Sequence, residues 1–119
     1  MKDERDRQRQ FITTGKRTKN GKKPNYARIY DDLFHSSAFR DLTPTAKRLY
    51  IDFIIASKGD IRFAFPKTAA AAAGYSTKRF FEAAKDLESH GFITVDRFKN
   101  SKNVYNLSGG WMQWKNGNE

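Results

Sequence analysis

The chain has 119 residues, contains no cysteine and carries a formal net charge of +10 at pH 7. This length suffices for one domain with a modest core, and the lack of cysteine excludes disulfides and thiolate metal sites. The charge favours a polyanionic partner, nucleic acid first and an anionic membrane surface second. Because we find no long apolar run and no secretory signal, we expect a cytoplasmic protein without membrane contact.

Positive charge is concentrated at the start of the chain. Residues 1–28 contain ten Lys or Arg against three Asp or Glu, and residues 11–28 have no acidic side chain and no helical apolar period. We therefore predict a flexible basic N-terminal arm over residues 1–28. Such arms enter the DNA minor groove in several folds, and a solubilising tail is the alternative. The candidate DNA-binding residues of the arm are Lys16, Arg17, Lys19, Lys22 and Lys23.

Short helical turns near residues 29–42 precede a clear helix over residues 44–57. Thr43 has the character of an N-cap and Pro44 suits the first helical position, where a missing N–H does no harm. The residues at the spacing of one buried face are Ala46, Leu49, Tyr50, Phe53, Ile54 and Ser57. Ile51 and Ile55 lie off that face, so this helix is buried on two sides or offers a face to a partner. Gly59 is expected to end it.

The second half of the chain predicts a helix-turn-helix followed by a hairpin. Ile61, Phe63 and Phe65 alternate as in a strand, and "PKTAAAAAGY" is typical of a short helix. After only "GYS", Ser76 caps a helix that Gly91 ends. Its inner stripe is Phe80, Ala83, Ala84 and Leu87. "FITVDRF" and "VYNLS" then predict two strands joined by a polar turn.

These elements predict an α+β fold, a winged helix-turn-helix with a three-helix core, a small antiparallel sheet and a hairpin wing. We place this domain at residues 29–111 and a C-terminal tail at residues 112–119. Trp111 follows the last strand directly, so we expect it to close the core. Trp114 is assigned neither to the core nor to a dimer seam.

Three segments, "FHSSAFRDLTPTAKRLYIDF", "AAAAAGYSTKRFFEAAKDLESHGFI" and "NVYNLSGGW", resemble the small winged-helix proteins of plasmids, phages and conjugative elements. That resemblance implies a recognition helix over residues 77–90, a wing over residues 99–103 and binding of double-stranded DNA. It also implies a role in transcription regulation, in DNA replication or in conjugation, as a regulator or as an accessory factor at a replication or transfer origin. The chain departs from the pattern at Phe81, where a small or polar residue is usual.

The recognition helix supplies the main candidates for DNA contact. Lys78, Glu82 and Lys85 share a face with Ser89, opposite the inner stripe. A solvated face with Glu82 paired to a lysine is the alternative. Ser76, Thr77 and Lys78 suit phosphate contact, Arg79 suits a guanine edge, and Glu82 is a weaker candidate for cytosine.

The predicted wing supplies a second set of candidates. Arg97, Lys99, Asn100, Lys102 and Asn103 surround its turn. Two lysines at a wing tip can follow phosphates or enter a minor groove. The alternative is that they protect a sheet edge, a common use of lysine in edge strands.

Nothing in the sequence indicates an enzyme, a cofactor or a metal site. His35 and His90 are isolated, and His90 stands where a histidine interacts with a helix C-terminus. An RNA-binding protein is disfavoured because no RNP-type aromatic pair or GXXG loop is present. A homodimer, or a protein partner bound to the recognition-helix face with DNA held by wing and arm, stays open.

Phe81 admits three interpretations. It lies about 100° from Phe80 on the helix, at the edge of the buried stripe. We expect a border residue of the core; the alternatives are contact with a thymine methyl and an anchor for a protein contact.

Overall fold

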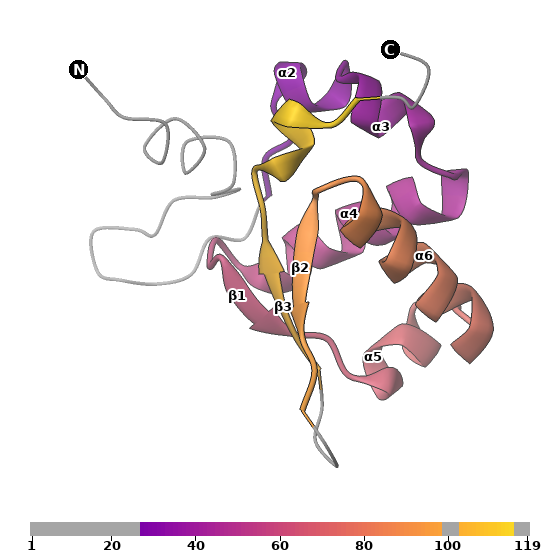
Figure 1. Ribbon diagram of the computed structural model, residues 1–119. Coiled ribbons are helices and arrows are strands. Elements are labelled where there is room, and N and C mark those ends of the chain that lie inside the picture. Colours follow the sequence, from indigo (N-terminus) through magenta and orange to yellow (C-terminus); the bar gives the residue numbers. More distant parts are fainter. Residues whose placement is uncertain (1–26, 99–102, 116–119) are drawn as a thin grey trace.

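The computed structural model describes residues 27–98 and 103–115. The elements follow in the order α2 (Asp31–Phe34), α3 (Ser37–Asp41), α4 (Pro44–Ser57), β1 (Arg62–Ala64), α5 (Lys67–Ala72), α6 (Thr77–Ser89), β2 (Ile93–Asp96), β3 (Val104–Leu107) and the 3-10 helix η1 (Gly110–Gln113). The fold is therefore α+β with a small antiparallel sheet, as predicted. The β2–β3 hairpin runs toward the end of the molecule opposite α2, α3 and η1 (Figure 1).

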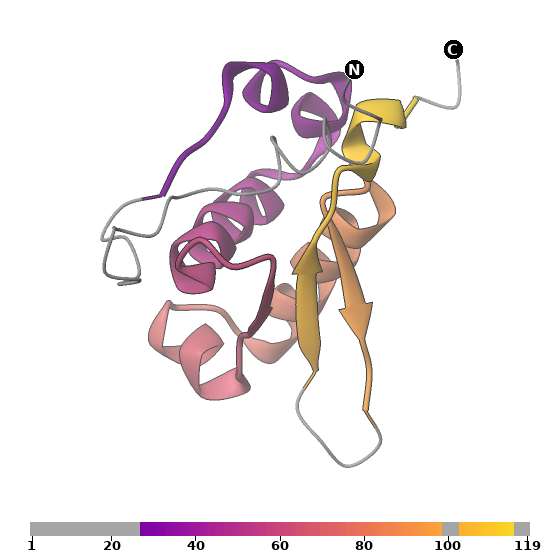
Figure 2. The ribbon, with the colours of Figure 1, turned by 90° about the vertical axis from the view of Figure 1, so that its left-hand side faces the viewer.

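The last strand in the sequence is the central strand of the sheet. β3 pairs antiparallel with both β1 and β2, giving the order β1-β3-β2. Tyr105 of β3 stands opposite Phe63 of β1, and both side chains are buried. On the other face Asn106 donates a hydrogen bond to Asp96 at 3.1 Å, and Arg62 pairs with the same carboxylate. The helices lie on the buried face of the sheet (Figure 2).

Side-chain caps begin the two long helices as predicted. The Thr43 hydroxyl accepts a hydrogen bond from the Ala46 N–H at 3.2 Å, at the start of α4. The Ser76 hydroxyl accepts one from the Arg79 N–H at 3.2 Å, at the start of α6. Because each cap satisfies an N–H group that has no partner within the helix, local sequence alone specifies where these helices begin.

α4 buries the predicted stripe, and all six of its residues are buried. Ile51 and Ile55 are 40% and 52% exposed, so the second apolar side of this helix faces solvent. The helix ends at Ser57, and Lys58 already adopts a left-handed conformation with φ of 53°, before Gly59 with φ of 84°. The left-handed turn thus begins one residue before the predicted glycine.

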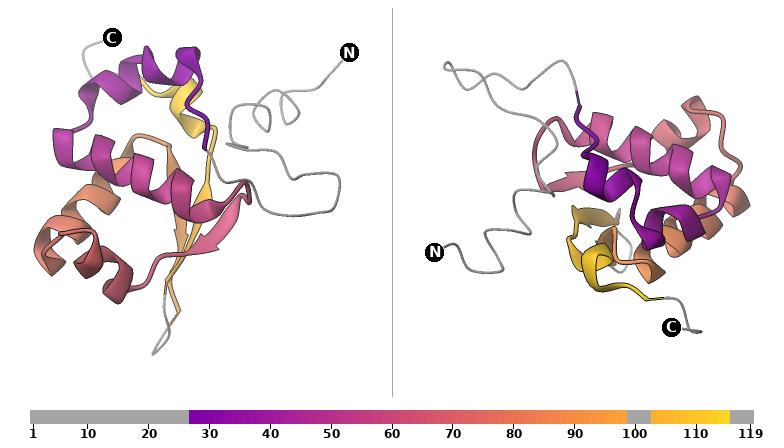
Figure 3. Two further views of the ribbon diagram at one scale, coloured as in Figure 1. Left: turned by 180° about the vertical axis from the view of Figure 1, so that it is seen from behind. Right: turned by 90° about the horizontal axis from the view of Figure 1, so that it is seen from above.

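The core is aromatic, and Phe53 of α4 is at its centre. Its ring, 0% exposed, lies 4.9–6.3 Å from the rings of Phe63, Phe65, Phe80 and Tyr105. These partners come from β1, the segment after β1, α6 and β3. A single buried ring therefore connects α4 to α6 and to the sheet, and α4 runs between the α2–α3 segment and the α5–α6 pair (Figure 3).

The chain after β3 returns to the end of α6. The Trp111 N–H donates to the Gly91 carbonyl at 2.9 Å, and Gly91 has a φ of 84°. A Cβ on Gly91 would lie 2.5 Å from the Gly110 carbonyl carbon, so the two backbones touch here. Trp111 is 5% exposed and stacks on Phe92 at 6.0 Å. Its predicted role in closing the core is confirmed.

Candidate nucleic-acid interface

One face of α6 is exposed along the length of the helix. The predicted inner stripe is buried at Phe80, Ala83, Ala84 and Leu87. On the opposite side lie four exposed residues, which we call the outer face: Lys78, Glu82, Lys85 and Ser89. Successive residues turn by about 100° around a helix, so these four side chains form one strip. The four residues predicted to lie opposite the inner stripe are thus all exposed.

The lysines of the outer face form no ion pair with another described residue. Glu82 is paired with neither Lys78 nor Lys85, although helical spacing would permit both pairs. Glu88 has a pKa below its usual value, and the positive charge of Lys85 is the smallest of the contributions that lower it. Both ammonium groups are therefore available to an anion from solution.

The first turn of α6 adds the positive end of the helix dipole. Ser76, Thr77 and Lys78 are all exposed. The Ser76 hydroxyl is engaged by the Arg79 N–H, so this side chain has a capping role of its own. The earliest N–H groups of any helix lack an intrahelical acceptor and favour anions. Phosphate contact by Thr77 and Lys78 stays a prediction that suits this geometry.

Arg79 lies on the flank of α6 that faces α4, away from the centre of the outer face. Together with Thr43, Glu82 and Asp86 it lines a cleft of about 450 Å³. Asp86 accepts a hydrogen bond from the Thr43 N–H at 3.0 Å, which ties α6 to the start of α4. The cleft is thus lined by charges of both signs, Arg79 and Lys85 together with Glu82 and Asp86.

Phe81 lies on the other flank, toward the hairpin. It is 45% exposed, and its ring centre is 5.8 Å from that of Phe80. The Lys67 ammonium stands 5.8 Å from the centre of the Phe81 ring. Phe81 is thus an exposed residue that touches the core through Phe80, and its role as a core border, a base contact or a protein anchor stays a prediction. Nearly half of it remains exposed, so its truncation should cost less than the 3–5 kcal/mol typical of fully buried phenylalanines.

A groove of about 300 Å³ separates this flank of α6 from the hairpin. We call it the hairpin groove; Phe81, Lys85, Glu88, Arg97, Asn103 and Tyr105 line it. Arg97 crosses from the hairpin to α6 and donates two hydrogen bonds to Glu88, at 2.9 and 3.2 Å. Its guanidinium therefore fixes the hairpin against α6 and is not a free charge of the wing. The hydrogen bond from Arg97 is the largest contribution to the lowered pKa of Glu88.

Of the remaining candidates for DNA contact, one is in the described part of the chain and the others are outside it. Asn103 lines the hairpin groove and is partly buried. Lys99, Asn100 and Lys102 of the predicted wing tip lie outside the described residues. The same holds for the arm residues Lys16, Arg17, Lys19, Lys22 and Lys23. Their contact with DNA stays a prediction from sequence.

Sequence reasoning missed the contribution of Lys67. This residue opens α5, and its exposed side chain reaches the Phe81 ring of α6. A lysine after proline at a helix start carries no signal of this contact, because the contact depends on how α5 packs against α6. The angle between the two helices places the ammonium beside the ring.

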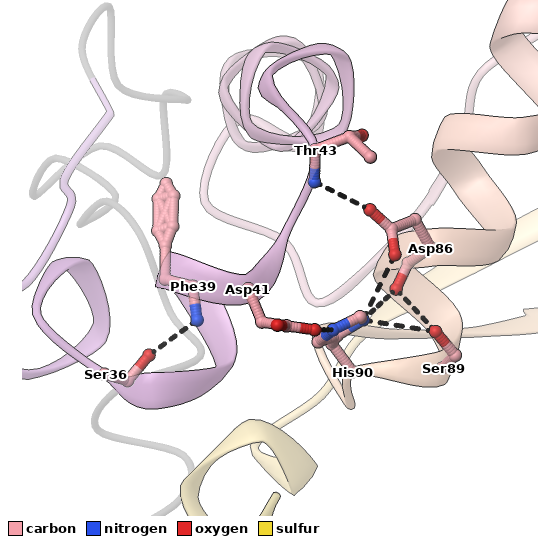
Figure 4. A network of polar contacts seen from close by, with 7 residues as sticks. All are labelled: Ser36, Phe39, Asp41, Thr43, Asp86, Ser89 and His90. Atoms are coloured by element: carbon pink, nitrogen blue, oxygen red, sulfur yellow. Dashed lines mark hydrogen bonds and ion pairs between the residues drawn. The ribbon is translucent and has the colours of Figure 1, made fainter. Parts of the chain in front are cut away.

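The far end of α6 is held by a polar network around His90 (Figure 4). His90 Nε2 lies 2.8 Å from the Asp41 carboxylate, and Nδ1 lies 2.8 Å from the Asp86 carbonyl oxygen and 3.2 Å from the Ser89 hydroxyl. The predicted contact of this histidine with the helix C-terminus is confirmed. The bond to Asp41 joins α6 to the end of α3, so the network fixes the orientation of the helix.

Burial lowers the pKa of His90. Its hydrogen bonds to Asp41 and Asp86, together with their negative charge, raise the pKa by more, so the net pKa is above the ordinary value. Trp114 stacks on the imidazole at 4.8 Å. η1 extends to Gln113 and Trp114 packs here, so residues 112–114 of the predicted C-terminal tail contact the core. The histidine therefore connects three parts of the chain.

No helix within residues 27–98 and 103–115 has the length and apolarity needed to cross a membrane. In the same part of the chain, no group of three or more His, Asp or Glu side chains is arranged to hold a metal ion. Comparisons of the chain with protein-family models, with curated proteins and with solved structures found no match.

Proposed function

We propose that this chain is a winged helix-turn-helix protein that binds double-stranded DNA, with α6 as recognition helix and the β2–β3 hairpin as wing. The observation that carries the proposal is the order α4-β1-α5-α6-β2-β3, with lysines on the outer face of α6 that no described residue pairs. In helix-turn-helix proteins the second helix of the motif enters the major groove. The net charge of +10 supports a polyanionic ligand.

In this proposal the outer face of α6 and the flank beside α4 have different tasks. Thr77, Lys78 and Lys85 contact phosphates and set the register of the helix. Arg79 reads a guanine edge from the flank beside α4, where it lines the cleft. The basic arm and the wing tip add further phosphate contacts. Glu82 is the weakest candidate, since its carboxylate suits only an exposed cytosine amine.

The proposed setting is a mobile genetic element, with the protein acting as a regulator or as an accessory factor at a replication or transfer origin. The resemblance to winged-helix proteins of plasmids, phages and conjugative elements supports this setting. The three roles use the same DNA contacts, so the target sequence distinguishes them better than the fold does.

Selection from a random duplex pool at two salt concentrations tests the proposal. A sharp sequence motif would support base readout by α6, and Arg79→Ala should then relax one position at a cost of about 1–3 kcal/mol. Steeply salt-dependent binding without a motif would reduce the protein to a basic scaffold. A failure to retain any duplex at low salt would refute binding of double-stranded DNA.

A second candidate function is a protein-contact surface on the helices, with DNA held mainly by the hairpin and arm. The exposed Ile51 and Ile55 of α4 and Phe81 of α6 favour it. Sedimentation of the wild type and Ile55→Glu tests the α4 side. A dimer that the substitution dissociates would support this candidate, and a wild-type monomer across the concentration range would argue against self-association.

A further inference from the structure

Phe81 is an exposed aromatic residue of α6 that duplex binding does not explain. Its ring stands on the flank that borders the hairpin groove, and Lys85 of the outer face lines the same groove. An isolated exposed phenylalanine is ordinary on a protein surface. Here, however, 45% of the residue is exposed beside a concave groove of about 300 Å³. Concave sites with an aromatic wall are the usual form of a ligand site.

The charges around the groove select an anionic ligand. Glu88 is ionised, since its pKa is lowered, and Arg97 compensates its charge through two hydrogen bonds. The Lys67 ammonium beside the Phe81 ring and the Lys85 ammonium at the groove wall have no such partner among the described residues. The groove therefore has an accessible aromatic ring and the Lys85 ammonium on its wall, and the Lys67 ammonium lies against the same ring.

The inner wall of the groove offers polar groups that suit the edge of a base. Asn103 lines it beside Tyr105, whose pKa is raised by burial. A side-chain amide has two donors and an acceptor, which suit the edge of a base. Stacking ring, flanking cations and an amide together match what proteins use to hold unpaired nucleotides.

We propose that the hairpin groove binds an unpaired base of single-stranded DNA. Phe81 is the stacking surface, Lys67 and Lys85 meet the flanking phosphates, and Asn103 meets the base edge. A duplex cannot occupy the site in this way, because its bases are stacked and present only their edges. The inference rests on the proposed function only in taking DNA as the ligand. An acidic peptide with an apolar side chain is the competing occupant, and the test below separates the two.

The test measures the affinity of the full chain for a fluorescein-labelled mixed-sequence single strand and for the duplex of the same sequence. Phe81→Ala should weaken single-strand binding about 5- to 150-fold, the loss typical of one stacked base, and change duplex affinity by less than about twofold. The matched control is Phe34→Ala, which truncates a phenylalanine of α2 that is 56% exposed. α2 lies at the end of the molecule opposite the hairpin (Figure 1), so both affinities should stay unchanged.

Phe81→Trp provides a second, independent readout. An indole keeps the stacking surface, so single-strand affinity should be retained, and its fluorescence should be quenched when a base stacks on it. Circular dichroism melting of each variant verifies that the fold is intact. Retained affinity without quenching would show that the strand binds elsewhere.

Three outcomes would overturn the proposal. The first is equal affinity of the wild type and Phe81→Ala for the single strand. The second is an equal loss of affinity for single strand and duplex in Phe81→Ala. The third is a variant that keeps its single-strand affinity but no longer self-associates in sedimentation, which indicates a protein contact. If the protein does not bind the duplex but binds the single strand in a Phe81-dependent way, the proposed duplex function is refuted and this inference is retained.

Discussion

The two ends of α6 differ in how they are held. At its last turn, Asp86 and His90 bond to residues of the α3–α4 region, and the backbone at Gly91 touches η1. At its first turn and along the outer face, Lys78 and Lys85 have no ion-pair partner among the described residues. One helix thus separates residues that hold the fold from residues that are open to a ligand. Substitutions at the two ends should accordingly change different quantities.

The strongest way to disrupt the held end is Gly91→Ala. The new Cβ would lie 2.5 Å from two backbone atoms of η1, and φ is 84°. Left-handed strain of roughly 1–2 kcal/mol and overpacking of roughly 1–3 kcal/mol together predict a loss of about 2–5 kcal/mol in the free energy of unfolding, measured by urea denaturation.

Gly74→Ala is the matched control for that substitution. Gly74 also has a positive φ, 95°, but its Cβ would meet only the end of the Arg48 side chain, at 3.9 Å. The backbone strain alone predicts a loss of about 1–2 kcal/mol. Equal losses at the two glycines would show that the contact with η1 does not hold the end of α6.

Asp41→Asn should weaken the same end by less, about 1 kcal/mol, because Asp41 is half exposed and solvent screens its pairing with His90. The folded pKa of His90 is raised, so its contribution to stability is fully present below about pH 6.5 and is lost as the pH rises through the folded value. Urea midpoints measured between pH 5.5 and about 8.5 should fall in the wild type and fall less in Asp41→Asn. Parallel curves would contradict the assignment.

Arg97→Gln should have a smaller effect, within the range of about 0.2–1 kcal/mol for exposed ion pairs. The pKa of Glu88 is lowered in the folded state, so the pair stabilises above the unfolded pKa and the contribution is lost as the pH falls through the folded value. Acid titration of stability should be flatter in the variant. An identical titration would mean that Arg97 does not hold the hairpin to α6.

The outer face should give the smallest change in stability. The double substitution Lys78→Gln and Lys85→Gln should leave the free energy of unfolding within about 0.5 kcal/mol of the wild type. The slope of log affinity for duplex DNA against log salt should flatten by about 0.9 for each phosphate that the variant no longer neutralises. A large drop in stability here would mean that the outer face belongs to the packed structure.

Local signals in the sequence were enough to place most helices and the buried faces. Thr43 and Ser76 cap the helices they were predicted to cap, and every predicted stripe residue of α4 and α6 is buried. These features depend on a few neighbouring residues and on helical spacing. The stacking of Trp114 on His90 was not predicted, because it is a contact between distant parts of the chain.

Pairings across the fold could not be predicted in the same way. His90 hydrogen-bonds Asp41, which is 49 residues away in the sequence. Arg97 donates to Glu88 because the hairpin packs beside α6. Lys67 reaches Phe81 through the angle between α5 and α6. Such contacts depend on how elements are oriented, and many side chains of suitable charge compete for each partner. The candidate site was therefore predicted as a set of residues, without its division into two flanks.

The central position of β3 has a consequence for how the protein forms during synthesis. β1 pairs with β3 and not with β2, so neither earlier strand has a neighbour in the sheet until residues 104–107 have left the ribosome. The α4–α6 packing can form earlier, because it needs only residues up to 89. Until β3 is available, Phe63 of β1 lacks its cross-strand partner Tyr105. During that interval β1 and β2 have unpaired edges, to which chaperones or other chains can bind.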